Sequence, residues 1–260
     1  MDISGKFVVV TGASGGIGAA LSRQLDKAGA KLLLVGRNEE KLQELLAELS
    51  GEGHRIVRAD ITTATGRDAV SGACGGELDV LINNAGLNGL ALLESQAVGD
   101  IEALTQINLL APILLCQRLL PELKLRDSGI ILNIGSTFGS IGYPGFAVYS
   151  ASKFGLRGFT EALRRELADT AIRVLYFAPR TTSTAMNSAK VDAMNAQLGN
   201  ACDDPKEVAK AAVNMLRFGG SSRFLGWPEK LFVKLNGLFP TLVDNALRKQ
   251  LPIIKTFAAR

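Results

Sequence analysis

The chain has 260 residues, of which 47% are hydrophobic and 21% are charged, a composition typical of a globular protein and not of a disordered one. Its net charge is only +4, but residues 223–260 carry seven Lys or Arg against two acidic residues, whereas residues 1–222 hold 22 basic and 23 acidic residues. A near-neutral body without interleaved basic and aromatic residues argues against nucleic-acid binding.

The cysteine and histidine counts exclude several kinds of site. Three cysteines lie far apart without a C-x-x-C spacing, so we expect neither a disulfide framework nor a zinc ribbon, but a reducing, cytoplasmic location. The single histidine, His54, excludes a multi-histidine metal site, and we expect no bound metal. The first residues lack the features of a signal peptide, and no stretch of 18 uncharged apolar residues predicts a membrane span.

Short apolar runs alternate with longer helical patterns along the chain. The runs predict strands over residues 7–10, 31–35, 55–58, 80–82, 130–134, 173–177 and 223–225. The periodic stretches predict helices over residues 17–28, 39–49, 101–125, 149–168 and 205–217. Because the runs are continuous in Val, Ile and Leu, the strands should be buried on both faces, which predicts an α/β fold of Rossmann type, a doubly wound seven-stranded parallel sheet in three α/β/α layers. The polar segment 181–204 predicts a mobile loop over a site.

A glycine-rich loop joins the first predicted strand to the first predicted helix. Glycines let backbone N–H groups approach a pyrophosphate, and the N-terminus of the following helix adds a favourable dipole. The alternative is an ordinary tight turn. The candidate cofactor contacts in this loop are Gly12, Ser14, Gly15, Gly16, Ile17 and Gly18.

The end of the second predicted strand bears on the choice of cofactor. NAD-binding folds place an acid there for the ribose 2′-hydroxyl, whereas this chain has Arg37, and Glu39 and Glu40 fall inside the next helix. A guanidinium binds a phosphate in bidentate fashion. The sequence therefore favours NADP(H) over NAD(H); the alternative is that Arg37 is only solvated.

Tyr149 and Lys153 are four residues apart, so on a helix they lie on one face. A lysine ammonium near a phenol favours the phenolate and should lower the pKa of Tyr149 from about 10, which makes it a candidate acid or base near neutral pH. Ser136, at the end of the fifth predicted strand, offers a hydroxyl for a carbonyl oxygen. Asn108 stands in an otherwise apolar helix, where an amide needs partners, and the alternative role is a helix-internal hydrogen bond.

These motifs together resemble the short-chain dehydrogenase/reductase superfamily, in its single-domain branch. The glycine spacing after Thr11 is T-G-x-x-x-G-x-G, and the order and spacing of Asn108, Ser136, Tyr149 and Lys153 match the family's catalytic tetrad. The resemblance implies that Tyr149 donates a proton to the carbonyl oxygen and that Ser136 anchors this oxygen. It implies that Lys153 holds the nicotinamide ribose and tunes Tyr149, and that Asn108 positions a water.

The resemblance, which covers about residues 5–226, implies further cofactor contacts. They are Asp60 and Ile61 after the third strand, Asn84, Ala85 and Gly86 in an N-N-A-G turn, and Pro179, Thr182 and Thr184 after the sixth strand. For Asp60, the alternative is a turn or helix-capping residue. Gly15 stands where the family often has a basic residue, and Arg180 replaces a glycine. Arg180 either contacts the cofactor or an anionic substrate group, or points to solvent.

The C-terminal segment 227–260 is predicted to be a helical extension beside a catalytic domain of residues 1–226. Its apolar residues have helical spacing that Pro240 and Pro252 should break. Three interpretations compete: helices packed on the core or on a second subunit, a basic amphipathic surface in peripheral contact with a membrane, and a lid over a lipophilic pocket. The ending resembles branches of the family that act on fatty-acyl or steroid-like compounds.

The sequence thus predicts an NADP(H)-dependent oxidoreductase that interconverts a ketone and a secondary alcohol on a small lipophilic, fatty-acyl or steroid-like, substrate. We expect a homodimer or homotetramer. One alternative is a nucleotide-sugar epimerase or dehydratase, which would be longer and carry a G-x-x-G-x-x-G loop. The other is a non-catalytic NADP(H)-binding sensor or scaffold protein, which would tend to lose Tyr149 or Lys153.

Overall fold

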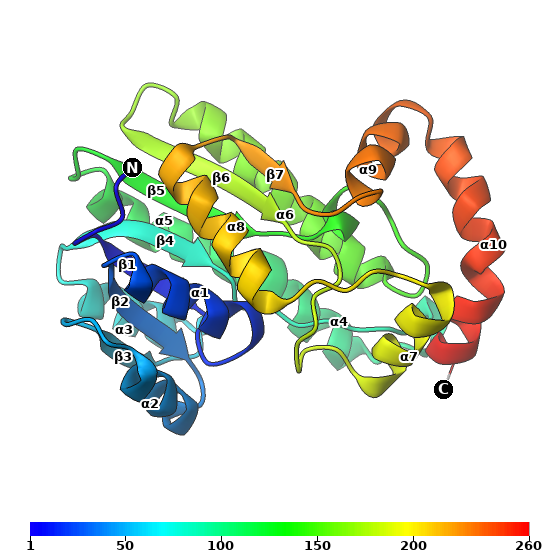
Figure 1. The fold of residues 1–260 in the computed structure, drawn as a ribbon, viewed down its shortest axis with the longest axis horizontal. Helices are drawn as coiled ribbons and strands as arrows, with labels where there is room; N and C mark the ends of the chain where they lie inside the picture. Colours follow the sequence, from blue (N-terminus) through cyan, green and yellow to red (C-terminus); the bar gives the residue numbers. More distant parts are fainter. Residues whose placement is uncertain (260) are drawn as a thin grey trace.

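Seven parallel strands form one sheet at the centre of the computed structural model, which describes residues 1–259 (Figure 1). The strands are β1 (Phe7–Thr11), β2 (Lys31–Gly36), β3 (Arg55–Arg58), β4 (Leu78–Asn83), β5 (Gly129–Ile134), β6 (Ile172–Ala178) and β7 (Ser222–Phe224). Their order across the sheet is β3-β2-β1-β4-β5-β6-β7. This arrangement confirms the predicted doubly wound fold, whose order reverses between β1 and β4, the point at which such folds bind ligands.

Helices cover both faces of the sheet. They are α1 (Gly16–Lys27), α2 (Glu39–Glu48), α3 (Ala64–Cys74), α4 (Val98–Thr105), α5 (Ala111–Leu123), α6 (Ala147–Glu166), α7 (Ala189–Leu198), α8 (Pro205–Phe218), α9 (Glu229–Leu238) and α10 (Pro240–Ala258). Three short segments are η1 (Leu93–Ser95), η2 (Gln106–Leu110) and η3 (Thr137–Gly139). One buried cluster joins the sheet to α1, α2 and α8, and a second joins it to α3, α5 and α6, which gives three layers.

The central strands are mostly apolar because both of their faces are buried, whereas the edge strands β3 and β7 begin with exposed polar residues. In β1, Val8 and Val10 belong to one cluster, whereas Phe7 and Val9 belong to the other. Successive side chains of a strand point to opposite faces, so a strand covered on both sides favours apolar residues at successive positions. This packing explains why the strands were readable from the sequence.

Two predicted segments differ from the structure. The helix predicted over residues 101–125 is divided into α4, the π-helical segment η2 and α5. The segment 181–204, predicted to be a loop, contains α7, which Ser188 caps by accepting a hydrogen bond from the backbone N–H of Val191. Helix α7 buries only Val191, Met194 and Asn195, so it lacks a clear apolar periodicity.

The stretch Val98–Leu123, which comprises α4, η2 and α5, is long and apolar enough for a membrane span on length and composition alone. Its residues Leu115, Leu119 and Leu123 are fully buried in the cluster on one face of the sheet. A core helix has the same apolar composition, so the stretch is weak support for a membrane span.

The C-terminal helices α9 and α10 form a hairpin at the end of the molecule that carries the carboxyl edge of β7 (orange and red in Figure 1). The hairpin is attached to the body: Ile254 of α10 is buried with Phe146, Val191 and Met194, and Asn236 Nδ2 donates to the Ser140 carbonyl at 2.8 Å.

The two prolines of the hairpin behave differently. Pro240 starts α10, as a proline at the first helical position does. Pro252 lies inside α10 without ending it, so the predicted break there is wrong. The residues beyond Pro252 stay helical because Ile254 and Ala258 are buried against the body.

Candidate active site

The glycine-rich loop after β1 is packed too tightly for side chains at two positions. A Cβ at Gly12, whose φ is +64°, would lie 2.8 Å from Ala85 Cα, and a Cβ at Gly18 would lie 2.1 Å from the Gly12 carbonyl oxygen. A Cβ at Gly15 would meet no atom within 4 Å, so this residue opens toward free space. The glycines thus bring the backbone of the loop close to the turn after β4.

Thr11 and Asn84 fasten this loop to the turn after β4. Thr11 Oγ1 accepts hydrogen bonds from the backbone N–H groups of Asn84 at 3.0 Å and Ala85 at 3.1 Å. Asn84 Nδ2 donates to the carbonyl oxygens of Thr11 at 3.0 Å and Gly12 at 3.2 Å. Thr11 was not predicted as a site residue, because its contacts are with a turn more than 70 positions away.

The N-terminus of α1 is suited to an anion. Within residues 1–259, no side chain caps this helix, and its first turn holds no acidic residue. Its first backbone N–H groups therefore lack intrahelical partners and lie at the cavity wall formed by Gly15, Gly16 and Ile17. A pyrophosphate would satisfy these donors.

Arg37 and Asp60 lie near each other at the carboxyl ends of β2 and β3. Arg37 is exposed. Hydrogen bonds from the Thr62 side chain (2.6 Å) and backbone N–H (3.0 Å) lower the pKa of Asp60 against the effect of burial, and the Arg37 charge adds a smaller lowering. Asp60 is therefore a turn residue, the alternative raised for it, and its second oxygen remains free for a ligand in the described contacts.

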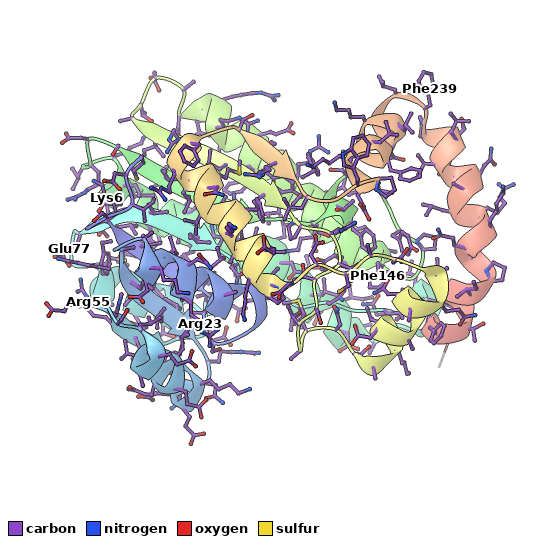
Figure 2. The ribbon with its side chains drawn as sticks, viewed as in Figure 1. Lys6, Arg23, Arg55, Glu77, Phe146 and Phe239 are labelled. Carbon is purple, nitrogen blue, oxygen red and sulfur yellow. The ribbon has the colours of Figure 1, made fainter. Side chains whose placement is uncertain are left out.

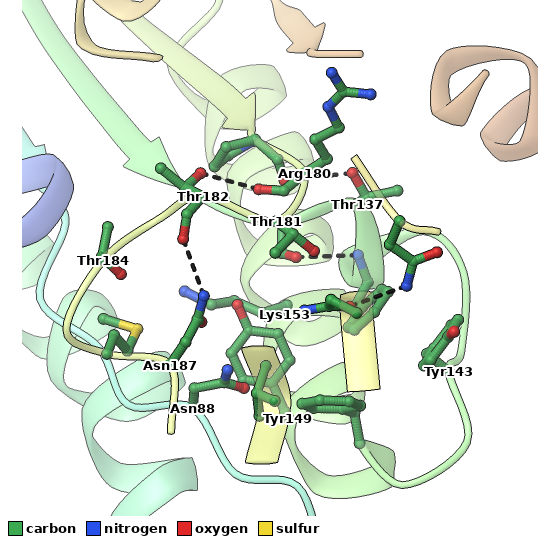
Figure 3. Close-up of a pocket in the computed structure, with 18 of the residues that line it drawn as sticks. Asn88, Thr137, Tyr143, Tyr149, Lys153, Arg180, Thr181, Thr182, Thr184 and Asn187 are labelled. Carbon is green, nitrogen blue, oxygen red and sulfur yellow. Dashed lines mark hydrogen bonds between the residues drawn. The ribbon is translucent and has the colours of Figure 1, made fainter. Parts of the chain in front are cut away.

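Most of the predicted site residues line one cavity of about 640 Å³ at the carboxyl edge of the sheet (Figure 3). They are Gly12, Ser14, Gly15, Gly16, Ile17, Asn84, Ala85, Gly86, Ser136, Tyr149, Lys153, Pro179, Thr182 and Thr184. Five others lie outside its lining: Gly18 and Ile61 are buried, Arg37 and Asp60 lie at the β2 and β3 ends, and Asn108 is 1% exposed behind Gly86.

The segment after β6 crosses the cavity between the glycine-rich loop and Lys153 (Figure 3). Thr182 Oγ1 donates to the Arg180 carbonyl at 3.0 Å, and the Thr182 carbonyl accepts from Asn187 Nδ2 at 3.1 Å. The Thr184 side chain would lie 3.1 Å from a Cβ at Gly16, so it rests on the glycine-rich loop. The segment thus covers one side of the cavity.

Ser136 is held by a tyrosine that the sequence did not single out. Tyr176 of β6 is fully buried, donates from its hydroxyl to the Ser136 carbonyl at 3.2 Å and accepts from the Ser136 N–H at 3.4 Å. A Cβ at Gly135 would lie 2.2 Å from the Tyr176 ring, and one at Gly139 would lie 2.3 Å from its hydroxyl. Tyr176 is thus the support on which the Ser136 turn rests.

Asn108 lies in the π-helical segment η2 and bonds outside its own helix. Its Oδ1 accepts from the Leu87 N–H at 2.8 Å, and its Nδ2 donates to the Leu87 carbonyl at 2.9 Å and to Ser152 Oγ at 3.2 Å. The helix-internal hydrogen bond is therefore not the role of Asn108. The amide instead fixes the segment that follows Gly86 against α6.

Burial controls the titration of Tyr149 and Lys153. Burial raises the pKa of Tyr149, and the hydrogen bond with the Ser136 side chain opposes this only in part. Burial lowers the pKa of Lys153 to about 8, and its Nζ donates to the Ile134 carbonyl at 3.2 Å, 5.8 Å from the Tyr149 ring centroid. The expectation that the pKa of Tyr149 is lowered is wrong for the chain alone, because desolvation by burial outweighs the hydrogen bond with Ser136.

The buried ammonium makes stability depend on pH. Because the pKa of Lys153 is about 8 in the folded chain and about 10.4 when exposed, the unfolded chain binds more protons between these values. The free energy of unfolding therefore contains a part that rises with pH across this window. We expect wild type to gain stability relative to Lys153→Met from about pH 8 to about pH 10, measured by urea unfolding.

The quantity to compare is the difference in the free energy of unfolding between wild type and Lys153→Met at each pH. Cys74 and Cys116, whose pKa burial raises to about 12, lower the stability at high pH in both proteins and cancel in the difference. A difference that is independent of pH would contradict the assignment of Lys153 as a buried ammonium.

Aromatic side chains form the wall of the cavity next to Tyr149. Phe138 stacks on Tyr143 with ring centroids 4.6 Å apart, and the Phe146 and Tyr149 rings lie 5.3 and 6.3 Å from Phe138. The Tyr143 hydroxyl donates to Gln250 Oε1 of α10 at 2.7 Å. The side of the cavity that faces Tyr149 is thus apolar, with one polar pair at its border.

The tail helices complete this wall. The cavity is lined from the C-terminal segment by Pro228, Glu229, Phe232, Val243, Ala246, Leu247 and Gln250. Two of the three interpretations of the tail were packing on the body and a lid over the pocket. The tail residues that pack on the body also line the pocket, so the two interpretations are compatible.

Arg180 fastens the tail to the body. Its guanidinium bonds Asp203 Oδ1 at 2.8 Å and Glu229 Oε2 at 3.2 Å, and it donates to the Trp227 carbonyl at 3.2 Å. Figure 3 shows the Arg180 guanidinium turned away from Tyr149. Arg180 is held by two carboxylates of the chain itself, so it is not free in solvent. It also lines the cavity, so its contact with a bound cofactor or an anionic substrate group stays a prediction.

Removal of this guanidinium should loosen the tail. We expect Arg180→Met to lower the free energy of unfolding by about 1–3 kcal/mol, because it leaves two half-buried carboxylates without their partner. Urea unfolding measures the change. The matched control is Arg118→Met, which breaks an exposed pair with Asp68 and should cost at most about 1 kcal/mol. Equal losses in the two variants would contradict a fastening role for Arg180.

Comparison with known proteins adds the following findings. The short chain dehydrogenase family matches residues 6–195. Carbonyl reductase family member 4 of Danio rerio is 35% identical over 218 residues, which are 81% of this chain and 91% of the relative. A Burkholderia cenocepacia short chain dehydrogenase solved in complex with NADP has a TM-score of 0.82 and 27% identity, covering 95% of this chain and 99% of that chain. A 3-ketoacyl-(acyl-carrier-protein) reductase from Brucella melitensis complexed with NADH has a TM-score of 0.79 and 26% identity, covering 87% and 99%.

Proposed function

Because this chain belongs to the short-chain dehydrogenase family and is an oxidoreductase, we propose that it interconverts a ketone and a secondary alcohol with NADP(H), on a lipophilic substrate of fatty-acyl or steroid-like type. One observation carries the proposal. Tyr149, Ser136 and Lys153 line the same cavity as the glycine-rich loop, so a dinucleotide on that loop and a carbonyl at Tyr149 would share one space.

The residues present fit a nicotinamide dinucleotide. The uncapped N-terminus of α1 offers backbone N–H groups to a pyrophosphate, and the free space beside Gly15 leaves room for it. Arg37, exposed at the end of β2, would hold a ribose 2′-phosphate, and the free oxygen of Asp60 lies beside it for the adenine end. The relatives solved with NADP and with NADH support either cofactor, and Arg37 is our reason for choosing NADP(H).

The proposed reaction needs a proton donor and a hydride donor. The bound nicotinamide supplies or accepts the hydride. Burial raises the pKa of Tyr149, so its phenol keeps its proton at neutral pH and can give it to a substrate oxygen. Ser136, fixed by Tyr176, holds that oxygen next to the phenol. In the reverse direction the Tyr149 oxygen receives the proton of the alcohol.

Lys153 and Asn108 would support this step from behind. The Lys153 ammonium lies 5.8 Å from the Tyr149 ring centroid, and its charge would stabilise a phenolate that forms after proton transfer. Asn108 fixes the Leu87 backbone and Ser152 next to Lys153, which would keep the lysine and the segment after Gly86 in place.

The aromatic wall and the tail helices argue for a lipophilic substrate. Phe138 and Phe146 pack on Tyr149, Tyr143 stacks on Phe138, and the tail adds Phe232 and Leu247 to the lining of the same cavity. Apolar walls gain free energy from every methylene that they remove from water, about 0.8 kcal/mol for each.

The test is a steady-state assay with a homologous series of ketones. We expect consumption of NADPH that matches formation of a secondary alcohol, with kcat/KM rising about fourfold for each added methylene until the cavity is full. A preference for the shortest, most water-soluble ketone would contradict the lipophilic substrate. Tight NADPH binding without turnover of any ketone in the series would contradict the reductase itself.

We further propose a catalytic unit of residues 1–226 with a helical extension of residues 227–260, assembled as a homodimer or homotetramer in the cytoplasm. A reducing compartment agrees with the thiols, since Cys74 and Cys116 are buried and unpaired and Cys202 is exposed.

A further inference from the structure

We propose that the turn between α9 and α10 is a docking surface for an anionic lipid bilayer. Its apolar part, called the apex cluster, consists of Leu238, Phe239 and Leu242 at the turn and continues along α9 through Phe232 and Leu231 to Trp227 at the inner end of that helix. Their exposed fractions, in the same order, are 72%, 55%, 60%, 38%, 45% and 69%. Among the residues that the structure describes, this 16-residue stretch contributes six of the fourteen exposed large hydrophobic side chains. Single exposed apolar residues are common, but such a concentration marks an interaction surface.

The hairpin is built to hold this cluster away from the body. Figure 2 shows Phe239 at the outer end of the turn, far from Phe146 in the cavity wall. The hairpin is fixed at its inner side by the Arg180–Glu229 ion pair, the Asn236–Ser140 hydrogen bond and the Tyr143–Gln250 hydrogen bond. The outer apolar side chains are therefore presented to a partner without a rearrangement of the fold.

Positive charge lies along both helices of the hairpin that carries the apex cluster. Lys230 and Lys234 of α9 and Arg248 and Lys249 of α10 are exposed. Of the two acidic residues in the segment, Glu229 is paired with Arg180, so Asp244 is the acid left to oppose them. Apolar side chains flanked by lysine and arginine are the composition that binds the interface of anionic membranes.

The charges favour a bilayer over a second copy of the chain. A symmetric dimer through this surface would place the same lysines and arginines of two chains against each other, and like charges repel. An anionic leaflet attracts each of them and also accepts the apolar side chains between them.

The surface is continuous with the active-site cavity. Phe232 belongs to the apex cluster and also lines the cavity, together with Ala246 and Leu247 of α10. A lipophilic compound dissolved in the bilayer would thus reach the cavity along the hairpin. This last consequence rests on the proposed function, whereas the docking itself does not.

Trp227 makes the test direct, because it is the only tryptophan of the chain. We expect its fluorescence to shift to the blue when the full-length protein is titrated with phosphatidylcholine vesicles that contain phosphatidylglycerol. Pure phosphatidylcholine vesicles should give a smaller shift, and added salt should weaken the response to the anionic vesicles, because salt screens the lysines and arginines. Absence of a shift with anionic vesicles would overturn the proposal.

Two pairs of variants separate the apolar and the charged contributions. In vesicle sedimentation, we expect Leu238→Asp/Phe239→Asp to weaken partitioning by at least about tenfold, whereas Phe218→Asp, at a still more exposed site at the end of α8, should leave it unchanged. Lys230→Gln/Lys234→Gln should abolish the preference for anionic vesicles, unlike Lys206→Gln/Lys210→Gln on α8.

Controls keep the alternatives apart. Analytical ultracentrifugation without lipid tests the second-copy alternative: a loss of oligomers in Leu238→Asp/Phe239→Asp with unchanged vesicle binding would assign the surface to a dimer and overturn the proposal. Turnover of a water-soluble ketone tests the active site separately, so a failure of the proposed reaction is distinguishable from a failure of docking. The lysine variants alter only exposed side chains and remain informative where the aspartate variant does not fold.

Discussion

Replacement of Tyr149 by Phe is expected to lower kcat by about 10²–10⁴-fold, the usual contribution of a general acid or base. The change removes one hydroxyl from a buried ring that packs among Phe138 and Phe146, so the shape of the cavity is kept. No other phenol lies where Ser136 could hold a substrate oxygen beside it, because the Tyr176 hydroxyl is bonded to the Ser136 backbone. The measurement is steady-state turnover of a ketone, with Tm and NADPH affinity recorded in parallel.

Tyr143→Phe is the matched control for this variant. Tyr143 lines the same cavity and loses the same atom, but its hydroxyl bonds Gln250 of the tail. We expect kcat to change by no more than about tenfold, the effect of one neutral hydrogen bond. If both variants lost activity equally, or if Tyr149→Phe kept full turnover, Tyr149 would not be the proton donor.

Arg37→Asp is expected to change the cofactor preference. The guanidinium can make two charge-assisted hydrogen bonds to a 2′-phosphate, each of about 1.5–3 kcal/mol, and the new carboxylate would repel the phosphate. We expect kcat/KM for NADPH to fall about 100-fold or more, while kcat/KM for NADH stays within about tenfold of wild type. Initial rates with the two cofactors at a fixed ketone concentration give the ratio.

A second charge reversal close to Arg37 distinguishes direct contact with the 2′-phosphate from a general effect of net charge on NADPH binding. Lys41→Asp reverses an exposed charge on α2, one turn beyond the end of β2, and should affect NADPH much less than Arg37→Asp does. Equal effects of the two variants on NADPH, or equal effects of Arg37→Asp on both cofactors, would remove Arg37 as the residue that selects the 2′-phosphate.

The parts of the fold that local pattern dictates were predictable. Strands buried on both faces are mostly apolar, and the glycine-rich loop joins β1 to α1 where the chain needs backbone without side chains. The spacing of Tyr149 and Lys153 placed both on one face of α6, and the structure brings both to the cavity.

The remainder depends on contacts between distant parts of the chain. Tyr176 bonds Ser136, 40 positions away in the sequence, and Arg180 bonds Glu229, 49 positions away. No local sequence pattern predicts either partner. The sign of the Tyr149 pKa shift was mispredicted for the same reason. Spacing brings Lys153 near, but the pKa of Tyr149 is raised by burial, which depends on packing against residues distant from α6 such as Phe138.

The π-helical segment that carries Asn108 also changes which residues of the flanking helices α4 and α5 face the same side. A π-helical turn holds one residue more than an α-helical turn, so α4 and α5 are rotated out of phase by one position. The single helix assumed for residues 101–125 is therefore two α-helical segments, α4 and α5, joined by the π-helical turn. A deletion of one residue between 106 and 110 would restore a regular helix and would turn the Asn108 amide away from Leu87. The π-helical turn thus belongs to the structure that holds Asn108 against Leu87 and Ser152.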